Sequence, residues 1–208
     1  LAASVQVVTE EIVLRLAKTI ANETKARNLC LAGGVALNCV ANSKILEAVP
    51  FKNVWIQPAA TDAGGALGAA LAAWYQYLKK ERSVQGNNDS MHGSYLGPSY
   101  STLEIKEMLQ KYHAVYKEYN EEDLVEEIAK KINEGTVIGW IQGIMEFGPR
   151  ALGNRSIIGD PRNEKMQSIM NMKIKFRESF RPFAPSIKED KINQYFDLDK
   201  KSPYMLFV

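Results

Sequence analysis

Two short apolar runs, each leading into a Gly-Gly pair, constrain the fold of the first third of the chain most strongly. Residues 28–32 are followed directly by the first pair, Gly33-Gly34. Residues 53–57 are followed by Pro58, and the second pair, Gly64-Gly65, begins six residues after this proline. Apolar runs of this length that end at Gly or Pro are typical of β-strands. The expected helices around them cover residues 5–21, 35–48 and 61–80. The alternation of helices and strands predicts an α/β layer.

A segment rich in turn-forming residues, 83–94, separates this region from the rest of the chain. We therefore place a domain boundary near residue 92, with a first domain at 1–91 and a second at 92–208. In the second domain, the expected helices cover 100–112, 120–133, 163–175 and 191–196, and the expected strands cover 114–119, 137–142, 155–161 and 183–187. This mixture predicts an α+β or mixed α/β domain.

The net charge of +2 gives the whole chain no strong attraction to nucleic acid or to membranes. Positive charge is concentrated between Arg150 and Arg181, where eight basic residues are accompanied by three acidic ones. No apolar run reaches the roughly 20 residues of a membrane-spanning helix, and no signal peptide is apparent. Cys30 and Cys39 do not form a CxxC pair, so we expect both to pack in the core of a protein of the reducing cytoplasm.

The Gly33-Gly34 turn is the first candidate ligand site. Glycines let a ligand approach the backbone closely, and the N-terminus of the helix that follows offers free N–H groups and the positive end of its dipole. A tight turn without any ligand explains the same residues. The second pair, Gly64-Gly65, follows the next strand, and in an open parallel sheet both turns lie at the carboxyl ends of the strands, where ligands bind.

Asp62 stands two positions before Gly64, the first glycine of the second pair, at the expected start of a helix. Its carboxylate either caps that helix or serves as a metal ligand beside a bound nucleotide. His92 and His113 are isolated in the sequence, so a histidine-based metal site cannot be completed within this chain.

The segment 142–156 combines Gly and Pro with two arginines, Arg150 and Arg155. Ordering such a loop costs conformational entropy, and Arg makes two-pronged contacts with phosphate and carboxylate groups. We therefore expect an anion site in this segment. Glu146 can pair with either arginine, so a structural ion-pair network is the alternative interpretation.

Lys173, Lys175 and Arg177 alternate along the chain and share one face if this piece is extended. Aromatic residues at positions 176, 180 and 183 lie between the basic ones, a pattern that also suits stacking on the bases of single-stranded RNA. A solvated basic face is a further interpretation, but the rigid Arg-Pro-Phe-Ala-Pro run that ends the segment speaks against it. On the residues alone, phosphate binding and RNA binding both stay open.

The runs EFGPRALGNRSIIGDPR and FRESFRPFAP resemble the NodU/CmcH/TobZ-type O-carbamoyltransferases, and the upstream LAGGVALN and PAATDAGGALGAA resemble the end of that family's first domain. The resemblance spans nearly the whole chain. It implies the C-terminal part of an actin-like or sugar-kinase-like ATPase domain (ribonuclease H-like) at 1–91, then a truncated YrdC-like domain at 92–208. Family members are far longer, so the chain resembles a fragment whose activity in isolation is in question.

The resemblance also implies the chemistry. The YrdC-like domain is expected to join carbamoyl phosphate and ATP into carbamoyl-adenylate, releasing pyrophosphate and phosphate. The first domain is expected to transfer the carbamoyl group to a hydroxyl of a small-molecule acceptor. Transfer is expected to use a divalent metal, with iron as the expected ion, held by Asp62 and by His residues outside this chain. A second copy of the chain, forming a homodimer, also stays open as a partner.

The resemblance assigns site residues by their positions. The expected catalytic residues are Arg150, Arg155, Lys173 and Arg177. The expected binding residues are Gly33, Gly34, Asn38, Gly64, Gly65, Glu146, Ser156, Lys175, Ser179 and Arg181. Fixed cations suit this reaction, because carbamoyl phosphate and ATP repel each other and charge develops on the leaving groups.

Two other functions remain open. A non-catalytic, RNA-binding YrdC-like module would use the basic and aromatic segment 173–183, although the modest net charge speaks against it. A sugar-kinase-like ATPase is suggested by the first part of the chain alone, but it leaves the Arg-rich second part without a role.

Overall fold

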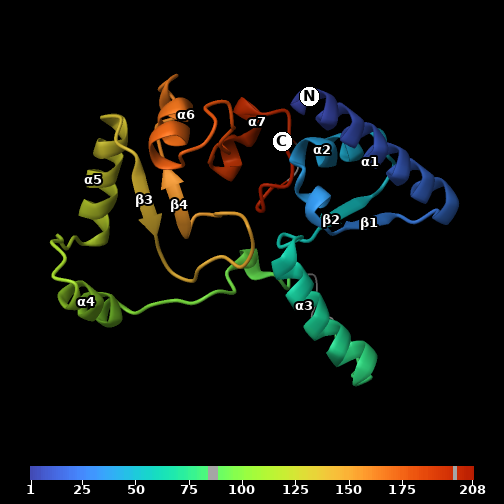
Figure 1. Cartoon of the computed structure of the whole chain (residues 1–208), viewed down its shortest axis with the longest axis horizontal. Coiled ribbons are helices and arrows are strands. Elements are labelled where there is room, and N and C mark those ends of the chain that lie inside the picture. The colour runs from blue at the N-terminus through green and yellow to red at the C-terminus, as the bar shows by residue number, and fades with distance from the viewer. Residues whose placement is uncertain (84–88, 199–200) are drawn as a thin grey trace. The chain divides into compact units, whose positions relative to one another are not determined.

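The computed structural model describes residues 1–83, 89–198 and 201–208 (Figure 1), so part of the expected linker at 83–94 lies outside the described residues. The described chain is mixed α/β with two small sheets. It forms two compact units. Unit 1 comprises Leu1–Leu96, Glu146–Leu152 and Ile192–Val208, and unit 2 comprises Gly97–Met145 and Gly153–Lys191. Unit 1 therefore includes two segments that come after the first part of unit 2 in the sequence. The family-based domain ranges 1–91 and 92–208 stay a prediction.

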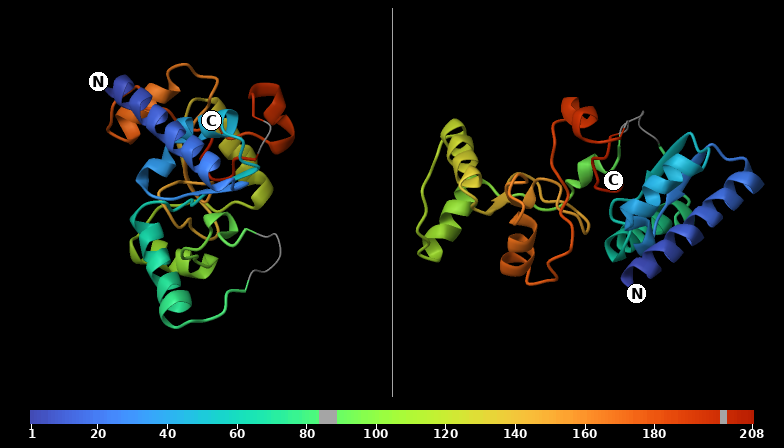
Figure 2. Two further views of the ribbon diagram at one scale, coloured as in Figure 1. Left: turned by 90° about the vertical axis from the view of Figure 1, so that its right-hand side faces the viewer. Right: turned by 90° about the horizontal axis from the view of Figure 1, so that it is seen from above.

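The sheet of unit 1 consists of β1 (Asn28–Leu31) and β2 (Asn53–Ile56), which pair in parallel. This confirms the α/β layer predicted for the first part of the chain. Two helices, α1 (Ala2–Thr24) and α2 (Cys39–Ala48), lie side by side and pack together (Figures 1 and 2). The buried core between these elements consists of Ala17, Leu29, Ile45, Val49 and Phe51.

The single helix expected at 35–48 is wrong, because a 3-10 turn (Gly34–Leu37) precedes α2. Asn38 interrupts the helix: its backbone is extended, and its side-chain oxygen accepts a hydrogen bond from the Ala41 amide at 3.1 Å. Asn38 is therefore the N-cap of α2. The free amides at the start of α2 follow Asn38 rather than the Gly33-Gly34 pair.

The helix after β2, α3 (Asp62–Ala72), continues into a π-helical turn (Ala73–Tyr77). Gly64 is required for its packing, since a Cβ at this position would lie 2.1 Å from the Ala59 carbonyl oxygen. Only a residue without a side chain fits there.

The last segment of the chain also packs in unit 1, where the short helix α7 (Ile192–Tyr195) precedes it. Leu206 is buried in a second apolar cluster with Ala36, Ile56 and Ala60. The fully buried Asn42 amide donates to the carbonyl oxygens of Ala36 at 2.8 Å and Leu206 at 3.1 Å. These two bonds satisfy a polar group that would otherwise be costly to bury.

Unit 2 contains the antiparallel strands β3 (Ile138–Ile141) and β4 (Arg155–Ile158) and the helices α4 (Thr102–Lys111) and α5 (Glu121–Asn133). α5 begins where the sequence predicts, directly after Asn120, and α4 begins two residues later than expected. Ser101 and Glu104 form a reciprocal capping box on α4, and Asn120 accepts from the Asp123 amide at 2.8 Å to cap α5.

The helix expected at 163–175 is present as α6 (Met166–Ile169) and a π-helical turn (Met170–Ile174). Gly159, just beyond β4, allows this helix to approach, since a Cβ there would lie 2.8 Å from the sulfur atoms of Met166 and Met170. A 3-10 turn (Glu189–Lys191) completes the unit.

The strands expected at 114–119 and 183–187 are wrong, because both segments are irregular in the described structure. Each described sheet has two strands, and neither includes these segments, so their backbones lack a ladder partner. In the second segment, Pro185 also removes a backbone donor. The expected burial of Cys30 is wrong as well, since Cys30 is exposed and Cys39 is partly buried. No helix in the described part of the chain is long and apolar enough to cross a membrane.

Candidate anion sites on two basic loops

The Arg150 loop (Glu146–Leu152) belongs to unit 1. The Arg150 guanidinium donates a hydrogen bond from Nη2 to the Leu37 carbonyl oxygen at 2.9 Å. Leu37 ends the 3-10 turn that starts at Gly34, so the guanidinium contacts the glycine turn singled out by the sequence. Its Nε is buried and has no hydrogen-bond partner among the described residues.

Hydrogen bonds to its backbone groups fix the Arg150 loop in place. The buried Glu146 carboxylate accepts from the Leu152 amide at 2.6 Å, and the Tyr95 hydroxyl donates to the Leu152 carbonyl at 2.8 Å. The Phe147 amide donates to the Ser94 carbonyl at 2.6 Å. Gly148 has a φ of 123°, and a Cβ there would lie 3.3 Å from the Cβ of Ala59. The loop therefore requires glycine both for its backbone conformation and for its packing.

The glycines of the first two motifs differ in their surroundings. Gly33 has a φ of 93°, and added Cβ atoms at Gly33, Gly34 and Gly65 would meet nothing within 4 Å. These three positions leave open space beside the backbone, as a ligand would require, whereas Ala59 occupies the space beside Gly64. The Asn38 side chain is engaged with Gln6 as well as with α2, through hydrogen bonds of 2.9 and 3.2 Å.

The Arg177 loop (residues 177–183) belongs to unit 2. Arg177 donates from Nε to the Asn171 side-chain oxygen at 2.6 Å, and its guanidinium carbon lies 4.9 Å from the centroid of the Phe183 ring. Arg181 forms an exposed ion pair with Glu178 at 2.7 Å. A backbone hydrogen bond to Glu178 and then this arginine lower the pKa of the Glu178 carboxyl. The loop thus presents guanidinium groups in defined positions.

The extended arrangement considered for Lys173, Lys175 and Arg177 is wrong. Lys173 lies in the π-helical turn, and the Lys175 amide donates to the Met170 carbonyl at 2.9 Å, so the alternation does not place these side chains on one face of a strand. The Ser179 carbonyl accepts from Asn171 at 3.1 Å.

Two more expected site residues lie on β4, also in unit 2. Arg155 begins the strand and is exposed. The neighbouring Ser156 hydroxyl accepts from the Gly153 amide at 3.1 Å. Unit 1 therefore holds Arg150 and the glycine turns, and unit 2 holds the other expected basic residues: Arg155, Lys173, Lys175, Arg177 and Arg181.

Asp62, the expected metal ligand, is exposed at the first position of α3. Within the described ranges, no group of three or more His, Cys, Asp or Glu side chains is placed to hold a metal ion. The Asp62 side chain makes no hydrogen bond or ion pair with another described residue, so its carboxylate is available as a single ligand.

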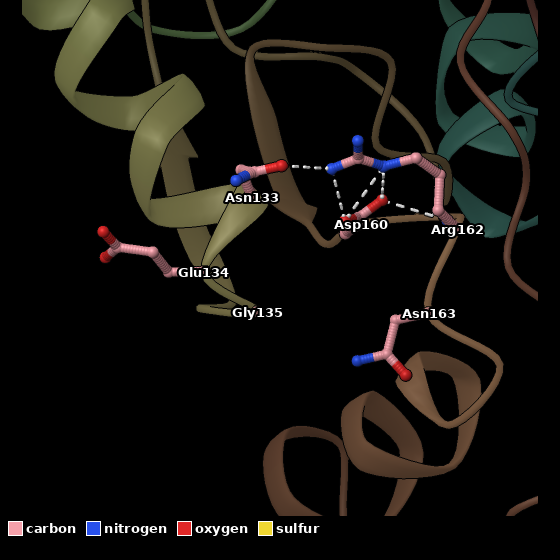
Figure 3. A pocket seen from close by; sticks show the side chains of 6 residues that line it. All are labelled: Asn133, Glu134, Gly135, Asp160, Arg162 and Asn163. Atoms are coloured by element: carbon pink, nitrogen blue, oxygen red, sulfur yellow. Dashed lines mark hydrogen bonds and ion pairs between the residues drawn. The ribbon is translucent and has the colours of Figure 1, made fainter.

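A pocket of about 370 Å³ lies in unit 2, between the end of α5 and the turn after β4 (Figure 3). Its lining residues are Asn133, Glu134, Gly135, Asp160, Arg162 and Asn163. Arg162 donates to the buried Asp160 carboxylate at 2.7 and 2.8 Å and to Asn133 at 2.8 Å. Hydrogen bonds from the Arg162 side chain and backbone lower the pKa of Asp160. The pocket contains no expected site residue, and its main charges neutralise each other.

Sequence reasoning missed two amides that hold the Arg177 loop, Asn171 and Gln167. Gln167 donates to the carbonyl oxygens of Phe180 at 3.2 Å and Arg181 at 3.0 Å. One signal was available for Asn171, which lies between Met170 and Met172 inside an expected helix. Asn is disfavoured in helix interiors, so its presence in an apolar run suggests a specific polar contact.

Comparison with known families adds a separate line of evidence. The family model described as "Carbamoyltransferase N-terminus" matches residues 1–71, and the one described as "Carbamoyltransferase C-terminus" matches residues 129–208. The second match includes the Arg150 and Arg177 loops, and the first includes the glycine turns.

Individual relatives agree with this assignment. An uncharacterized protein of Synechocystis sp. is 60% identical over 210 residues, covering 100% of this chain and 34% of that protein. Nodulation protein NolO of Bradyrhizobium diazoefficiens is 39% identical, covering 99% of this chain and 37% of that protein. Nodulation protein U of Sinorhizobium fredii is 36% identical, covering 88% and 30%. The chain spans about a third of the length of these curated relatives. As its motifs predicted, the chain belongs to the carbamoyltransferase family.

Proposed function

We propose that this chain is part of an ATP-dependent O-carbamoyltransferase. The observation that carries the proposal is the match of both carbamoyltransferase regions within one chain. The two loops with hydrogen-bonded arginines support it, because fixed guanidinium groups bind phosphate without reorganising. In this proposal, residues 1–91 have the actin-like fold and residues 92–208 the YrdC-like fold.

The first step of the proposed reaction forms carbamoyl-adenylate. Carbamoyl phosphate takes up one water and releases phosphate, and an oxygen of the resulting carbamate attacks the α-phosphorus of ATP. The bond from that phosphorus to the bridging oxygen breaks, and pyrophosphate leaves. The basic residues of unit 2 would neutralise the repulsion between the two anions and the charge on the leaving group. These residues are Arg155, Lys173, Lys175, Arg177 and Arg181.

In the second step, the hydroxyl of a small-molecule acceptor attacks the carbamoyl carbon, AMP leaves, and the hydroxyl proton is released. Arg150 and the open glycine turn in unit 1 suit the phosphate side of such a ligand, because the guanidinium contacts the turn through Leu37. Asp62 would supply one ligand to a divalent metal, for which iron is the expected ion. The metal would polarise the carbamoyl carbonyl or the acceptor hydroxyl when bound.

Carbamoyl-phosphate-dependent exchange of pyrophosphate into ATP tests the first step in the full-length protein. Arg155→Ala is expected to abolish the exchange, whereas Arg15→Ala, which removes an exposed arginine paired with Glu11, leaves it unchanged. If the exchange persists in Arg155→Ala, the proposed role of this arginine is wrong.

Asp62→Ala separates the two steps. We expect it to block transfer to the acceptor while carbamoyl-adenylate still forms, because Asp62 lies on α3 of unit 1. Both products can be followed by chromatography of the nucleotides and of the acceptor. Loss of both steps together would assign Asp62 to folding instead.

One observation favours the RNA-binding alternative: Phe176 and Phe180 are 85% and 73% exposed beside basic residues. Exposed aromatic rings of this kind can stack on unpaired bases. Titration with single-stranded RNA at several salt concentrations distinguishes the two functions. Tight binding that weakens steeply with salt would favour the RNA-binding module.

A further inference from the structure

Asn171 is a fully buried polar side chain at the base of the Arg177 loop, with 0% of its surface exposed. All of its side-chain hydrogen bonds go to that loop. Its amide nitrogen donates to the carbonyl oxygens of Ser179 at 3.1 Å and Arg181 at 2.8 Å. Its side-chain oxygen accepts from the Nε of Arg177 at 2.6 Å. One buried amide therefore joins three positions of the basic loop.

The backbone reinforces this arrangement. The Arg177 amide donates to the Asn171 carbonyl at 3.0 Å, so the same residue holds Arg177 by its main chain and by its side chain. Asn171 lies in the π-helical turn Met170–Ile174, a form of helix often found at functional sites. Phe176, just before Arg177, has a left-handed φ of 49°, the backbone conformation that commonly ends a helix.

Gln167, four positions before Asn171, adds two further hydrogen bonds to the same loop. Its exposed amide donates to the carbonyl oxygens of Phe180 at 3.2 Å and Arg181 at 3.0 Å. Two amides on one helix edge thus accommodate three consecutive carbonyl groups, from Ser179 to Arg181. With its carbonyls held against the helix, the loop keeps a fixed backbone.

The contacts of Arg177 determine which of its donors remain available. Its Nε donates to the Asn171 side chain, and its guanidinium carbon lies over the Phe183 ring, 4.9 Å from the centroid. Its two terminal nitrogens make no hydrogen bond to any other described residue. These nitrogens form a parallel pair of donors, the arrangement that binds two oxygens of a phosphate or carboxylate.

We infer that Asn171 is a positioning residue for anion recognition: it holds Arg177 by Nε so that the two terminal nitrogens bind a phosphate-bearing substrate. The inference rests on the proposed function, which makes that substrate carbamoyl phosphate or ATP. Asn is the suitable side chain because it accepts from Arg177 and donates to the loop carbonyls at the same time. An aspartate can accept from Arg177 but cannot donate to Ser179 or Arg181.

Steady-state pyrophosphate exchange in the full-length protein tests the inference. Asn171→Ala is expected to raise the KM for carbamoyl phosphate or ATP by roughly tenfold, the effect of one or two lost hydrogen bonds. Asn171→Asp keeps the acceptor for Arg177 and is expected to restore part of the loss. In an Arg177→Lys background, which lacks Nε in this position, Asn171→Ala should add much less. Ser168→Ala is the matched control, because its hydroxyl contacts the Met172 sulfur alone.

A purely structural role would give a different result. In that case Asn171→Ala would raise KM by the same factor in the wild-type and Arg177→Lys backgrounds, and the inference would be overturned. If Asn171→Ala does not fold, Gln167→Ala provides the second variant, since its side chain is exposed. It is expected to raise KM by about threefold at an unchanged melting temperature. An unchanged KM would count against the inference.

Failure of the proposed function gives a separate signature, because the wild-type protein would then show no exchange. Calorimetric binding of inorganic pyrophosphate replaces the kinetic readout in that case. Weaker binding in Asn171→Ala, partly restored in Asn171→Asp, still supports positioning of Arg177. Equal binding by all three proteins overturns it.

Discussion

The Arg150 loop and the Arg177 loop both fix an arginine, but they do so by different means. The Arg150 loop is held by residues far away in sequence: Leu37 is 113 positions from Arg150, and Tyr95 is 57 positions from Leu152. The Arg177 loop is held by its own neighbourhood, with Asn171 only 6 positions away. The geometry of the first loop therefore depends on the whole of unit 1, whereas that of the second depends on a single helix and the turn after it.

The substitution Gly148→Ala should damage the Arg150 loop most. The alanine would have to adopt a backbone φ of 123°, and its Cβ would lie 3.3 Å from the Cβ of Ala59. We expect a loss of about 2–3 kcal/mol in the free energy of unfolding. Chemical denaturation measures this loss, and hydrogen exchange at the Leu152 amide reports on the loop itself, while exchange in the Arg177 loop should stay as in the wild type.

Gly68→Ala is the matched control, since this glycine lies in α3 and has open space around it. A helical glycine replaced by alanine gains stability, by up to about 1 kcal/mol. Equal destabilisation by both substitutions would show that the conformation of Gly148 is not what fixes the loop.

A smaller effect is expected for Tyr95→Phe, which removes only the hydroxyl that donates to the Leu152 carbonyl at 2.8 Å. The cost should be about 1 kcal/mol, the usual contribution of one such hydrogen bond. Thermal unfolding compared with Tyr100→Phe, whose side chain is 62% exposed, measures the difference. Identical melting temperatures for the two variants would show that the Tyr95 hydroxyl does not stabilise the loop.

The smallest effect concerns acid, which should affect the Arg177 loop through the Glu178–Arg181 pair. A backbone hydrogen bond and then Arg181 lower the pKa of Glu178 in the folded protein, so these contacts stabilise the loop above the ordinary glutamate pKa of 4.5 and lose this contribution as the pH falls through the lower folded value. The pair is exposed, which keeps its contribution small. Carbon NMR titration of the Glu178 carboxyl measures the pKa, and an ordinary value would contradict the pairing.

Local signals account for what the sequence predicted correctly. Asn120 caps a helix that begins as expected, because a cap depends on residues three positions away. The two Gly-Gly turns after apolar runs predicted the parallel pair β1 and β2. Family motifs then identified the carbamoyltransferase family, a step that composition and periodicity alone leave open.

The sequence failed where a structure depends on distant partners. Residues 114–119 have the composition of a strand, but a strand needs a neighbour, and both described sheets pair other segments. The contact of Arg150 with Leu37 was equally out of reach, because no pattern in either segment refers to the other. Asn171 is the intermediate case: its polarity in an apolar run was visible, but its three partners depend on the loop's turn.

The return of two late segments to unit 1 has a consequence for protein engineering and for gene recombination. A crossover at the linker near residue 92 would exchange the Arg150 loop and the Leu206 segment together with unit 2. Foreign sequence in the place of Leu206 would then have to pack against Asn42, Ala36 and Ile56 of the recipient. Chimeras joined at that linker should therefore tolerate exchange only between relatives that keep both returning segments alike.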